Sequence, residues 1–366
     1  MTTANMIRAC RSLLVQFLFS LGLSACAPNP VIEQPIMTSN STATSALFDF
    51  RPWCVGRFVV ERPAGSGLTN ERYSYGGERL EIIKGVSQEE FKKKVVAREQ
   101  ELIKLVRSDI SGDISKGIKK TNISWLEKSA SPIPNSRIFV FRRIESGSRE
   151  PASDGEAYVL AGHNMFITRS LVGYGYAQKY IDDRGKRLAR IKYRDNWTIP
   201  NERGFCIDGG LIGGPDMDSE AVSQNFALLP GKPAGFSISM RDAVESDLKT
   251  GLTDRMPELR QKLKQGNFFQ YLRALREGKR HVAGMDGEEV LFAFKEGDVR
   301  LFRFYYLVPG NPASVAQPHT EIQLRLGSVP SGGKSAAEST SPLDEAGAVL
   351  LWDTLLNRMR LRPGAM

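Results

Sequence analysis

The stretch "KRHVAGMDGEEVLFAFKEGDVRLFRFYYLV", from Lys279 to Val308, determines the class of fold. It contains three short runs in which β-branched and aromatic residues alternate with polar ones, a pattern that predicts strands. The expected strands are 279–285, 289–295 and 299–308. Asp286-Gly287 matches a two-residue hairpin turn, and Glu296-Gly297-Asp298 fits the next turn. The stretch therefore predicts an antiparallel meander.

The rest of the chain mixes further strand patterns with helical ones. The other expected strands are 55–60, 79–85, 137–143, 156–162, 163–169, 205–207, 235–240 and 319–327. Runs of antiparallel strands with interspersed helices indicate an α+β fold. The pattern divides into two domains, 47–198 and 199–366, and we expect each to be an antiparallel sheet with packed helices.

Four helices are predicted from caps and apolar spacing. Ser87 and Glu90 form a capping-box pattern before a run of apolar residues at near-helical spacing. Ser341 is the expected cap of the last helix, with Pro342 in its first turn. The two other helices are expected within 176–191 and 253–265.

A segment without charge runs from Ser12 to Cys26, directly after Arg8 and Arg11. A membrane-spanning helix needs about 20 apolar residues, whereas about 10–14 are typical of a signal peptide. Leu23-Ser24-Ala25-Cys26 resembles a bacterial lipobox, which would make 1–25 a lipoprotein signal peptide and Cys26 the lipidated residue. A transmembrane anchor, or an ordinary signal peptide with a chance cysteine, are the alternatives.

Residues 26–46 are rich in Pro, Ser, Thr and Asn and have no periodicity, which predicts a flexible tether of about 25 Å. Ala27 after the cysteine suggests sorting to the periplasmic leaflet of the outer membrane. The formal charge is +9, and loss of Arg8 and Arg11 with the signal peptide would leave +7. This excess favours an acidic partner or an anionic lipid surface. Nucleic acid is not an expected partner of an exported lipoprotein.

Two of the four cysteines remain after processing. Cys10 would leave with the signal peptide and Cys26 would carry lipid, so Cys54 and Cys206 remain in a compartment that oxidises thiols. A disulfide between them is the economical prediction. Two buried free thiols are the alternative, because cysteine packs well as a small apolar residue.

No motif predicts catalysis or a bound metal. Ala64 stands where a nucleophile elbow needs its first glycine, and "GGKS" at 332–335 lacks the spacing of a phosphate-binding loop. The chain has no CxxC pair, and His163, His281 and His319 are far apart with no serine or acid in a recognisable partner motif. We therefore expect no metal, no cofactor and no small-molecule substrate. The residues favour a binding protein over an enzyme.

Four segments together resemble a known family. They are "CVGRFVVERP" at 54–63, "RGFCIDGGLI" at 203–212, "HTEIQLRLG" at 319–327 and "LLWDTLLNRMRLRP" at 350–363. Their order and spacing resemble the immunity proteins that protect bacteria from type VI secretion lipase (phospholipase) effectors. The resemblance covers most of the mature chain. It implies a two-domain lipoprotein whose second domain opens at the Gly-Phe-Cys motif. The basic segment "RGKRLARIKYR" at 184–194 departs from the family pattern.

The resemblance implies a periplasmic protein that binds a lipase effector tightly and does no chemistry itself. Such an inhibitor occludes the active site or holds the lid of the lipase, and two domains joined by a hinge could grip it from two sides. Aromatic residues often dominate such interfaces. The candidate anchors are Trp53, Tyr73, Tyr75, Tyr174 and Trp197, although each could instead belong to the core. A structural envelope lipoprotein without an enzyme target, or a lipoprotein hydrolase, are the rival functions.

Overall fold

The computed structural model describes residues 45–111, 119–142, 153–173, 175–249, 251–265, 272–329, 333 and 335–366. The predicted signal peptide, Cys26 and the tether up to residue 44 lie outside the described residues. Among the helices within these ranges, none is long and apolar enough to cross a bilayer.

The first half of the described chain is rich in strands and begins with a helical turn at 45–47. Its elements are β1 (Phe50–Val55), β2 (Phe58–Pro63), β3 (Gly67–Tyr75), β4 (Glu78–Lys84), α3 (Gln88–Lys104), β5 (Val106–Ser111), β6 (Lys119–Ser124), β7 (Leu126–Ala130), β8 (Ser136–Arg142), β9 (Ser153–Ala161), β10 (Asn164–Val172), α4 (Ala177–Leu188) and β11 (Ile191–Tyr193).

The second half repeats this mixture and ends on a short strand. Its elements are β12 (Gly204–Ile207), β13 (Gly210–Gly213), β14 (Ala221–Ala227), β15 (Ala234–Arg241), the 3-10 helices η2 (Glu245–Lys249) and η3 (Thr253–Arg255), α5 (Met256–Gln265), β16 (Leu272–Val282), β17 (Met285–Glu296), β18 (Val299–Val308), β19 (His319–Leu326), α6 (Ala336–Ser339), α7 (Glu345–Asn357) and β20 (Arg360–Leu361).

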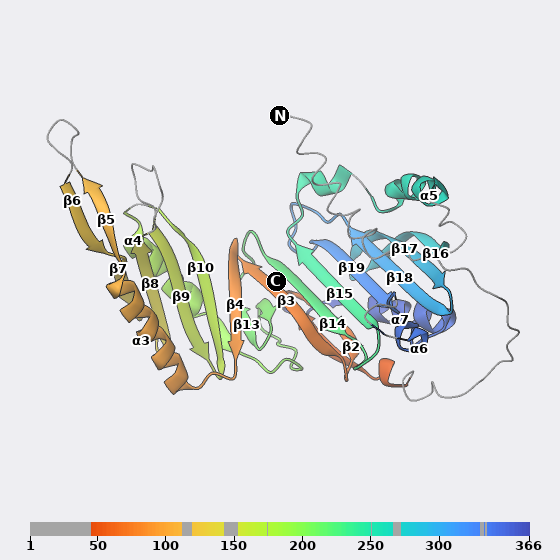
Figure 1. Cartoon of the computed structure of the whole chain (residues 1–366), viewed down its shortest axis with the longest axis horizontal. Helices are drawn as coiled ribbons and strands as arrows, with labels where there is room; N and C mark the ends of the chain where they lie inside the picture. Colours follow the sequence, from red (N-terminus) through yellow and green to blue (C-terminus); the bar gives the residue numbers. More distant parts are fainter. Residues whose placement is uncertain are drawn as a thin grey trace, which may run out of the picture.

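Twelve strands form one continuous sheet that runs across both halves (Figure 1), in the order β16-β17-β18-β19-β15-β14-β3-β4-β10-β9-β8-β7. All its described pairings are antiparallel, which confirms the predicted α+β class. The sheets of the two domains meet where β3 pairs with β14, with Tyr73 opposite Val222. The predicted hinge is wrong, because a ladder of backbone hydrogen bonds crosses the boundary between the domains.

One edge of this sheet collects the carboxyl ends of several strands. Four antiparallel pairings lead from β15 through β14, β3 and β4 to β10, so β15 and β10 run in the same direction. Their carboxyl ends therefore lie along the same edge, which we call the carboxyl edge and which is uppermost in Figure 1. The chain enters the body at the opposite edge, since β3 starts there at Gly67.

Helices cover both faces of the first half of the sheet. Residues of α3 pack against Phe139 and Tyr158, whereas residues of α4 pack in a separate cluster with Val140 and Val159. Successive strand residues point to opposite faces, so these two helices lie on opposite faces. In the second half, α7 contributes the fully buried Trp352 to the same core cluster that α4 joins.

The predicted capping box of α3 is confirmed. The Ser87 hydroxyl accepts a hydrogen bond from the backbone N–H of Glu90 at 3.2 Å, and the Glu90 carboxylate accepts one from the backbone N–H of Ser87 at 2.8 Å. Phe91, Val95 and Leu102 of this helix are buried. The apolar spacing therefore identified the buried face.

The predicted hairpin turn at Asp286-Gly287 is wrong, because the turn lies three residues earlier. Val282 pairs with Met285, so Ala283 and Gly284 form the turn with φ of 55° and 82°. Two positive φ values are characteristic of the tight turn that matches strand twist. Gly287 lies inside β17, where a Cβ atom would come within 2.7 Å of the Tyr306 ring.

Two other predicted boundaries are wrong. The strand expected at 55–60 is a hairpin, since Val55 pairs with Phe58 and Gly56 takes a positive φ of 57°. The last helix begins at Glu345, and its cap is Asp344, which accepts from the backbone N–H of Gly347 at 2.8 Å. The expected cap Ser341 instead accepts from the backbone N–H of Leu343, which orders the turn before the helix.

Candidate functional site

Three of the predicted partner-binding residues lie inside the protein. Trp53, Tyr73 and Tyr75 are buried, so the prediction that they present exposed rings to a partner is wrong. The Trp53 indole N–H donates to the Gln224 side chain at 3.0 Å, which satisfies its polar atom within the core. Tyr174 lies outside the described residues.

The fourth described candidate, Trp197, lies half-buried in a stack of cations and rings. The guanidinium of Arg62 lies 4.4 Å from the Trp197 ring centre and 4.0 Å from that of Trp53. The exposed Arg51 lies 4.6 Å from Trp197 on its outer side. Cation–π contacts of this kind stabilise the position of the ring. Trp197 thus packs the segment between β11 and β12, residues 194–203, which we call the linker, against β1 and β2.

Cys54 and Cys206 form a disulfide in the structure, with Cα atoms 5.9 Å apart. Cys54 belongs to β1 and Cys206 to β12, so the bond joins the beginnings of the two domains. The backbone pairs there as well, because Gly56 and Cys206 exchange two hydrogen bonds of 3.2 and 2.7 Å. The junction is therefore fastened both covalently and by the backbone.

A buried ion pair reinforces this junction. Arg57 makes a two-pronged contact with Glu220, with distances of 2.7 and 2.5 Å, and both side chains are buried. The remaining nitrogen of its guanidinium donates to the backbone oxygen of Ala365. Arg362, near the end of the chain, donates to the backbone oxygens of Pro200, Glu202 and Gly204. These arginines hold the linker and the end of the chain against the first domain.

A cluster of polar side chains lies beneath the sheet where the two halves meet. The Tyr73 hydroxyl donates to Glu71 at 2.7 Å and accepts from Gln224 at 2.7 Å and from the backbone N–H of Asp208 at 3.0 Å. The Asp208 carboxylate is fully buried and pairs with Lys84. Burial, together with the nearby charge of Asp208, raises the pKa of Glu71 to about 7. The cluster takes up a proton near neutral pH.

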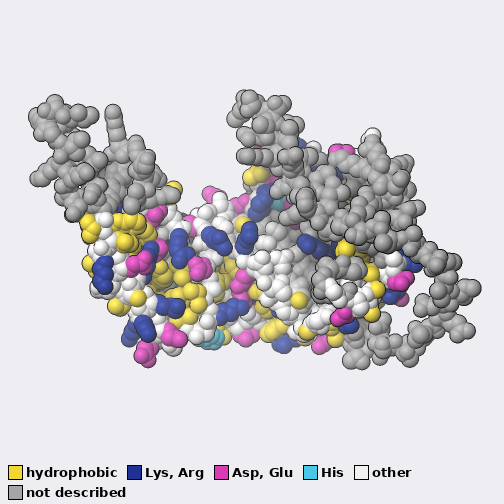
Figure 2. Space-filling view, viewed as in Figure 1, with side chains coloured by type: hydrophobic (Ala, Val, Ile, Leu, Met, Phe, Trp, Pro, Cys, Tyr) yellow, Lys and Arg dark blue, Asp and Glu magenta, His cyan; other side chains and the backbone are white. Residues whose placement is uncertain are grey.

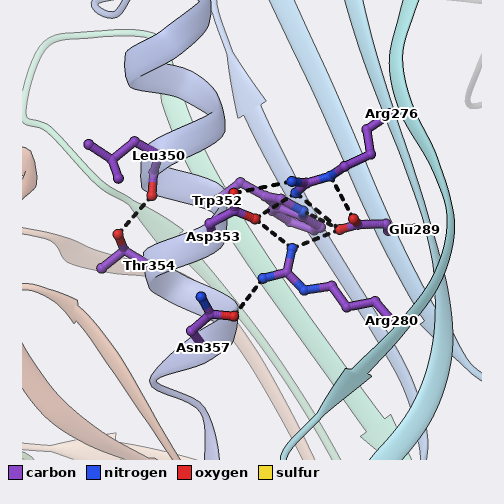
Figure 3. Close-up of polar contacts among 8 residues, drawn as sticks. All are labelled: Arg276, Arg280, Glu289, Leu350, Trp352, Asp353, Thr354 and Asn357. Carbon is purple, nitrogen blue, oxygen red and sulfur yellow. Dashed lines mark hydrogen bonds and ion pairs between the residues drawn. The ribbon is translucent and has the colours of Figure 1, made fainter.

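The largest group of charges in the second domain is structural (Figure 3). Arg276 and Arg280 of β16 each form ion pairs with Glu289 of β17 and with Asp353 of α7. The nitrogen–oxygen distances are 2.5 to 2.9 Å. Burial opposes the charge of Asp353, but hydrogen bonds from both arginines outweigh it and lower the pKa of that carboxyl. The Trp352 indole donates to Glu289 at 2.9 Å. Because two cations meet two anions, the group holds α7 on the sheet and offers no free charge.

The basic segment at 184–194 is also largely engaged within the protein. Arg184 pairs with Glu78 at the turn between β3 and β4, and Arg187 approaches the same carboxylate at 3.8 Å. Arg194 is buried and donates to five backbone oxygens around the linker. This segment therefore fastens α4 and the linker, and it is not a free cationic surface.

The histidines lie apart in the fold, as they do in the sequence. His163 packs against the Tyr193 ring at 4.5 Å, His281 contacts Asp286, and His319 contacts Glu321. Within the described ranges, no three His, Cys, Asp or Glu side chains are grouped closely enough to hold a metal ion.

Exposed apolar side chains mark the carboxyl edge as the candidate partner-binding surface. Leu171, near the carboxyl end of β10, is 65% exposed, and Tyr176, which follows β10, is 60% exposed. Val244 and Leu248 follow β15 and are 48% and 55% exposed. The two pairs are separated by four strand spacings, or roughly 19 Å on a flat sheet. Exposed apolar residues grouped at one end of a sheet are typical of a protein-binding surface. The surface is wide enough for a partner to bridge both domains.

Sequence reasoning missed all four of these residues. Part of the sequence signal was present, because "GYGYAQ" and "DAVESDLKT" place Tyr176, Val244 and Leu248 after predicted strands. Leu171 lies in β10, beyond the strand predicted at 163–169. The prediction selected Tyr174 from the first loop and passed over its neighbour Tyr176.

Comparison with known proteins identifies the class. Models of the N-terminal and C-terminal domains of Tle cognate immunity protein 4 match residues 51–199 and 198–364. The protein is thus an immunity protein of type VI secretion, and the predicted resemblance is confirmed. The chain belongs to the Tle cognate immunity protein 4 family.

Solved structures show the same fold. The apo immunity protein TplEi of the type VI secretion system from Pseudomonas aeruginosa matches with a TM-score of 0.71 and 22% identity, over 89% of this chain and 100% of its own. A crystal structure of a Tle4–Tli4 complex matches with a TM-score of 0.72 and 23% identity, over 87% and 99%. No curated protein sequence matches the chain.

Proposed function

We propose that this protein inhibits a cognate type VI secretion lipase by binding it with one-to-one stoichiometry at the carboxyl edge. The observation that carries the proposal is the position of the exposed pairs Leu171/Tyr176 and Val244/Leu248 on one edge of a continuous sheet. Family membership supports the kind of partner, and the solved Tle4–Tli4 complex supports direct contact between such proteins.

The rigid junction suits such an inhibitor. The disulfide, the Arg57–Glu220 pair and the continuous sheet fix the spacing of the two apolar pairs before the partner arrives. A preorganised surface loses less conformational freedom on binding, which favours high affinity. The inhibitor would thus occlude the active site or hold the lid by steric contact, with no chemical step of its own.

We also propose that the protein acts in the periplasm, anchored through lipid on Cys26. The lipobox pattern supports this location, and a lipase that attacks membranes from the periplasm would meet its inhibitor there. Two or more acyl chains make such anchoring stable. Mass spectrometry of the protein from its own cells should detect acylated Cys26 at the amino terminus. A free Cys26 thiol on an uncut chain would contradict the anchor.

The test of inhibition is a titration of a cognate type VI secretion lipase with residues 27–366, which contain the whole described core. Activity should fall linearly to near zero at one equivalent. Replacing Leu171→Asp together with Leu248→Asp should weaken inhibition at least 100-fold, because each change places a charge in an apolar contact. Leu350→Asp is the matched control, since Leu350 is 58% exposed on α7 away from the carboxyl edge.

Two outcomes would contradict the proposal. Undiminished lipase activity at several equivalents would remove the immunity function for that enzyme. Equal losses of inhibition in the double variant and in Leu350→Asp would show that the carboxyl edge is not the contact surface.

A further inference from the structure

Two arginines face each other on the outer face of the sheet. Arg303 of β18 and Arg325 of β19 are direct cross-strand partners. Like charges in this position destabilise a sheet. Arg303 donates to the backbone oxygens of Phe302, Leu326 and Gly327, and Arg325 donates to the Gln323 side chain. In the part of the chain that the structure describes, neither has a carboxylate partner.

Two acidic residues of the neighbouring elements, Glu321 of β19 and Glu338 of α6, contact other residues. Glu321 lies four residues before Arg325 on β19 and contacts His319 at 3.4 Å. Glu338 accepts hydrogen bonds from Ser335 at the start of α6. Burial, and to a smaller degree the charge of Arg325, lower the pKa of Arg303. The two guanidinium groups therefore present uncompensated positive charge that an added anion would stabilise.

A hollow of about 320 Å³ opens beside Arg325. The register places Ala227, Gly235 and Arg325 side by side on neighbouring strands, and the two small residues leave room next to the guanidinium. The half-buried Pro233 supplies an apolar wall, and Ser328 lies in the lining as a hydroxyl-bearing residue. We call this site the Arg325 hollow. A cation, a hydroxyl and an apolar wall suit a phosphate group that carries a short apolar neighbour.

The surroundings of the hollow contain few competing charges. The outward residues of β14 and β15 are small and uncharged, for example Ser223, Asn225, Ser237 and Ser239, except Arg241, which pairs with Asp247. Figure 2 shows this part of the surface, over β14 and β15 of Figure 1, as largely neither charged nor hydrophobic. A flat, uncharged surface of this kind lets a broad partner approach the hollow closely.

The hollow lies at the edge of the sheet where the chain enters the body. Ala227 in its floor pairs with Gly67, the first residue of β3. A tight turn leads from Gly67 back to Pro63, which pairs with Phe50, only five residues after Ser45. The tether predicted for residues 26–46 would span about 25 Å as a coil. A lipid on Cys26 would thus keep this edge close to the membrane.

We propose that the Arg325 hollow binds the phosphate of an anionic phospholipid headgroup. The proposal rests on the proposed function for the lipid anchor that brings the membrane to this edge. Headgroup contact would orient the body so that the carboxyl edge points away from the bilayer. A lipase bound there would then be held at a distance from its substrate.

The test measures binding of residues 27–366, without lipid, to vesicles and to free sn-glycerol 3-phosphate. Vesicles that contain phosphatidylglycerol should bind at least tenfold more tightly than vesicles of phosphatidylcholine alone. Arg325→Glu should lower the affinity for phosphatidylglycerol vesicles at least tenfold, and Arg325→Lys should lower it less. Arg79→Glu is the matched control, because Arg79 is exposed near the carboxyl edge and the change in net charge is the same.

The outcomes separate this proposal from the proposed function. Equal losses in Arg325→Glu and Arg79→Glu, or no preference for phosphatidylglycerol, would overturn the headgroup site. Binding of free glycerol phosphate without vesicle binding would show an anion site that does not serve the membrane, and would also overturn it. Arg325→Glu should leave lipase inhibition unchanged. Loss of inhibition with intact vesicle binding would instead assign Arg325 to the lipase interface.

Discussion

Glu71 shows how much a single residue depends on the meeting of the two domains. Its carboxylate lies on β3 of the first domain, close to the buried Asp208 of the second, and it accepts a hydrogen bond from Tyr73. The domain boundary therefore contains a group whose protonation changes near neutral pH.

Glu71 should make stability depend on pH. Its pKa rises from 4.5 to about 7 on folding, so the folded protein binds a proton more tightly than the unfolded chain. The corresponding stabilisation is complete below about pH 4.5, decreases as pH rises to about 7, and is constant above that. In urea unfolding between pH 5 and 8, the free energy of unfolding of Glu71→Gln should decrease less with rising pH than that of the wild type. Glu81→Gln, at the exposed pair with Arg169, should keep the wild-type slope.

The misplaced aromatic residues show what local sequence cannot predict. Trp53 and Tyr73 carry polar atoms that usually favour an interface. Their burial depends on Gln224, which lies 171 and 151 residues away in the chain and accepts from one ring and donates to the other. Nothing near Trp53 or Tyr73 in the sequence indicates that this partner exists.

At the scale of elements, the start of α3 is specified by its own residues. Ser87→Ala removes the hydroxyl that accepts from the Glu90 N–H, and losing such a cap costs about 1 kcal/mol. We expect a loss of this size in the free energy of unfolding, measured in urea. Ser335→Ala removes the same contact from the four-residue α6 and should cost less, because fewer packed residues depend on it. Equal stability of wild type and Ser87→Ala would contradict the role of the cap.

The sequence predicted strands well where alternation was strong and missed them where it was weak. β18 alternates buried and half-buried residues along most of its length, and its apolar residues alone identify it. β3 and β14 were missed although they join the two domains. Their inward positions include the polar residues Glu71 and Gln224, and Gln224 of β14 donates to Tyr73 of β3, which is 151 residues away in the chain. Local hydrophobicity therefore gives no signal at the junction.

At the scale of the whole molecule, the disulfide joins two residues that are far apart in the chain and closes a long loop. Cys54 and Cys206 are 152 residues apart, so the bond removes much conformational freedom from the unfolded chain. The variant with both cysteines replaced by alanine should lose about 2–5 kcal/mol of stability, measured by urea unfolding under oxidising conditions. In reducing buffer the stability of the wild type should approach that of the variant, because the disulfide is then broken. An unchanged unfolding midpoint in the variant would contradict a stabilising disulfide.

The division near residue 199 stays a prediction, and the structure adds what connects the residues on its two sides. The sequence contained the cysteines, the glycines and the basic segment that make the connection. It did not indicate that Arg57 would meet Glu220, or that one sheet would cross the boundary. Contacts between residues so far apart are specified by the complete fold and by no local pattern.

The pairing of β20 with β2 has a consequence for the order of synthesis. A ribosome makes the chain from its amino end, yet β2 receives its second neighbour only from residues 360–361. The hydrogen-bond partners of Arg57, Glu220 and the backbone oxygen of Ala365, are likewise made much later than Arg57 itself. A nascent or truncated chain that ends before residue 360 therefore leaves an open strand in its first domain. Only a chain that includes residues 360–361 closes that edge, and we expect proteases to cleave shorter chains faster.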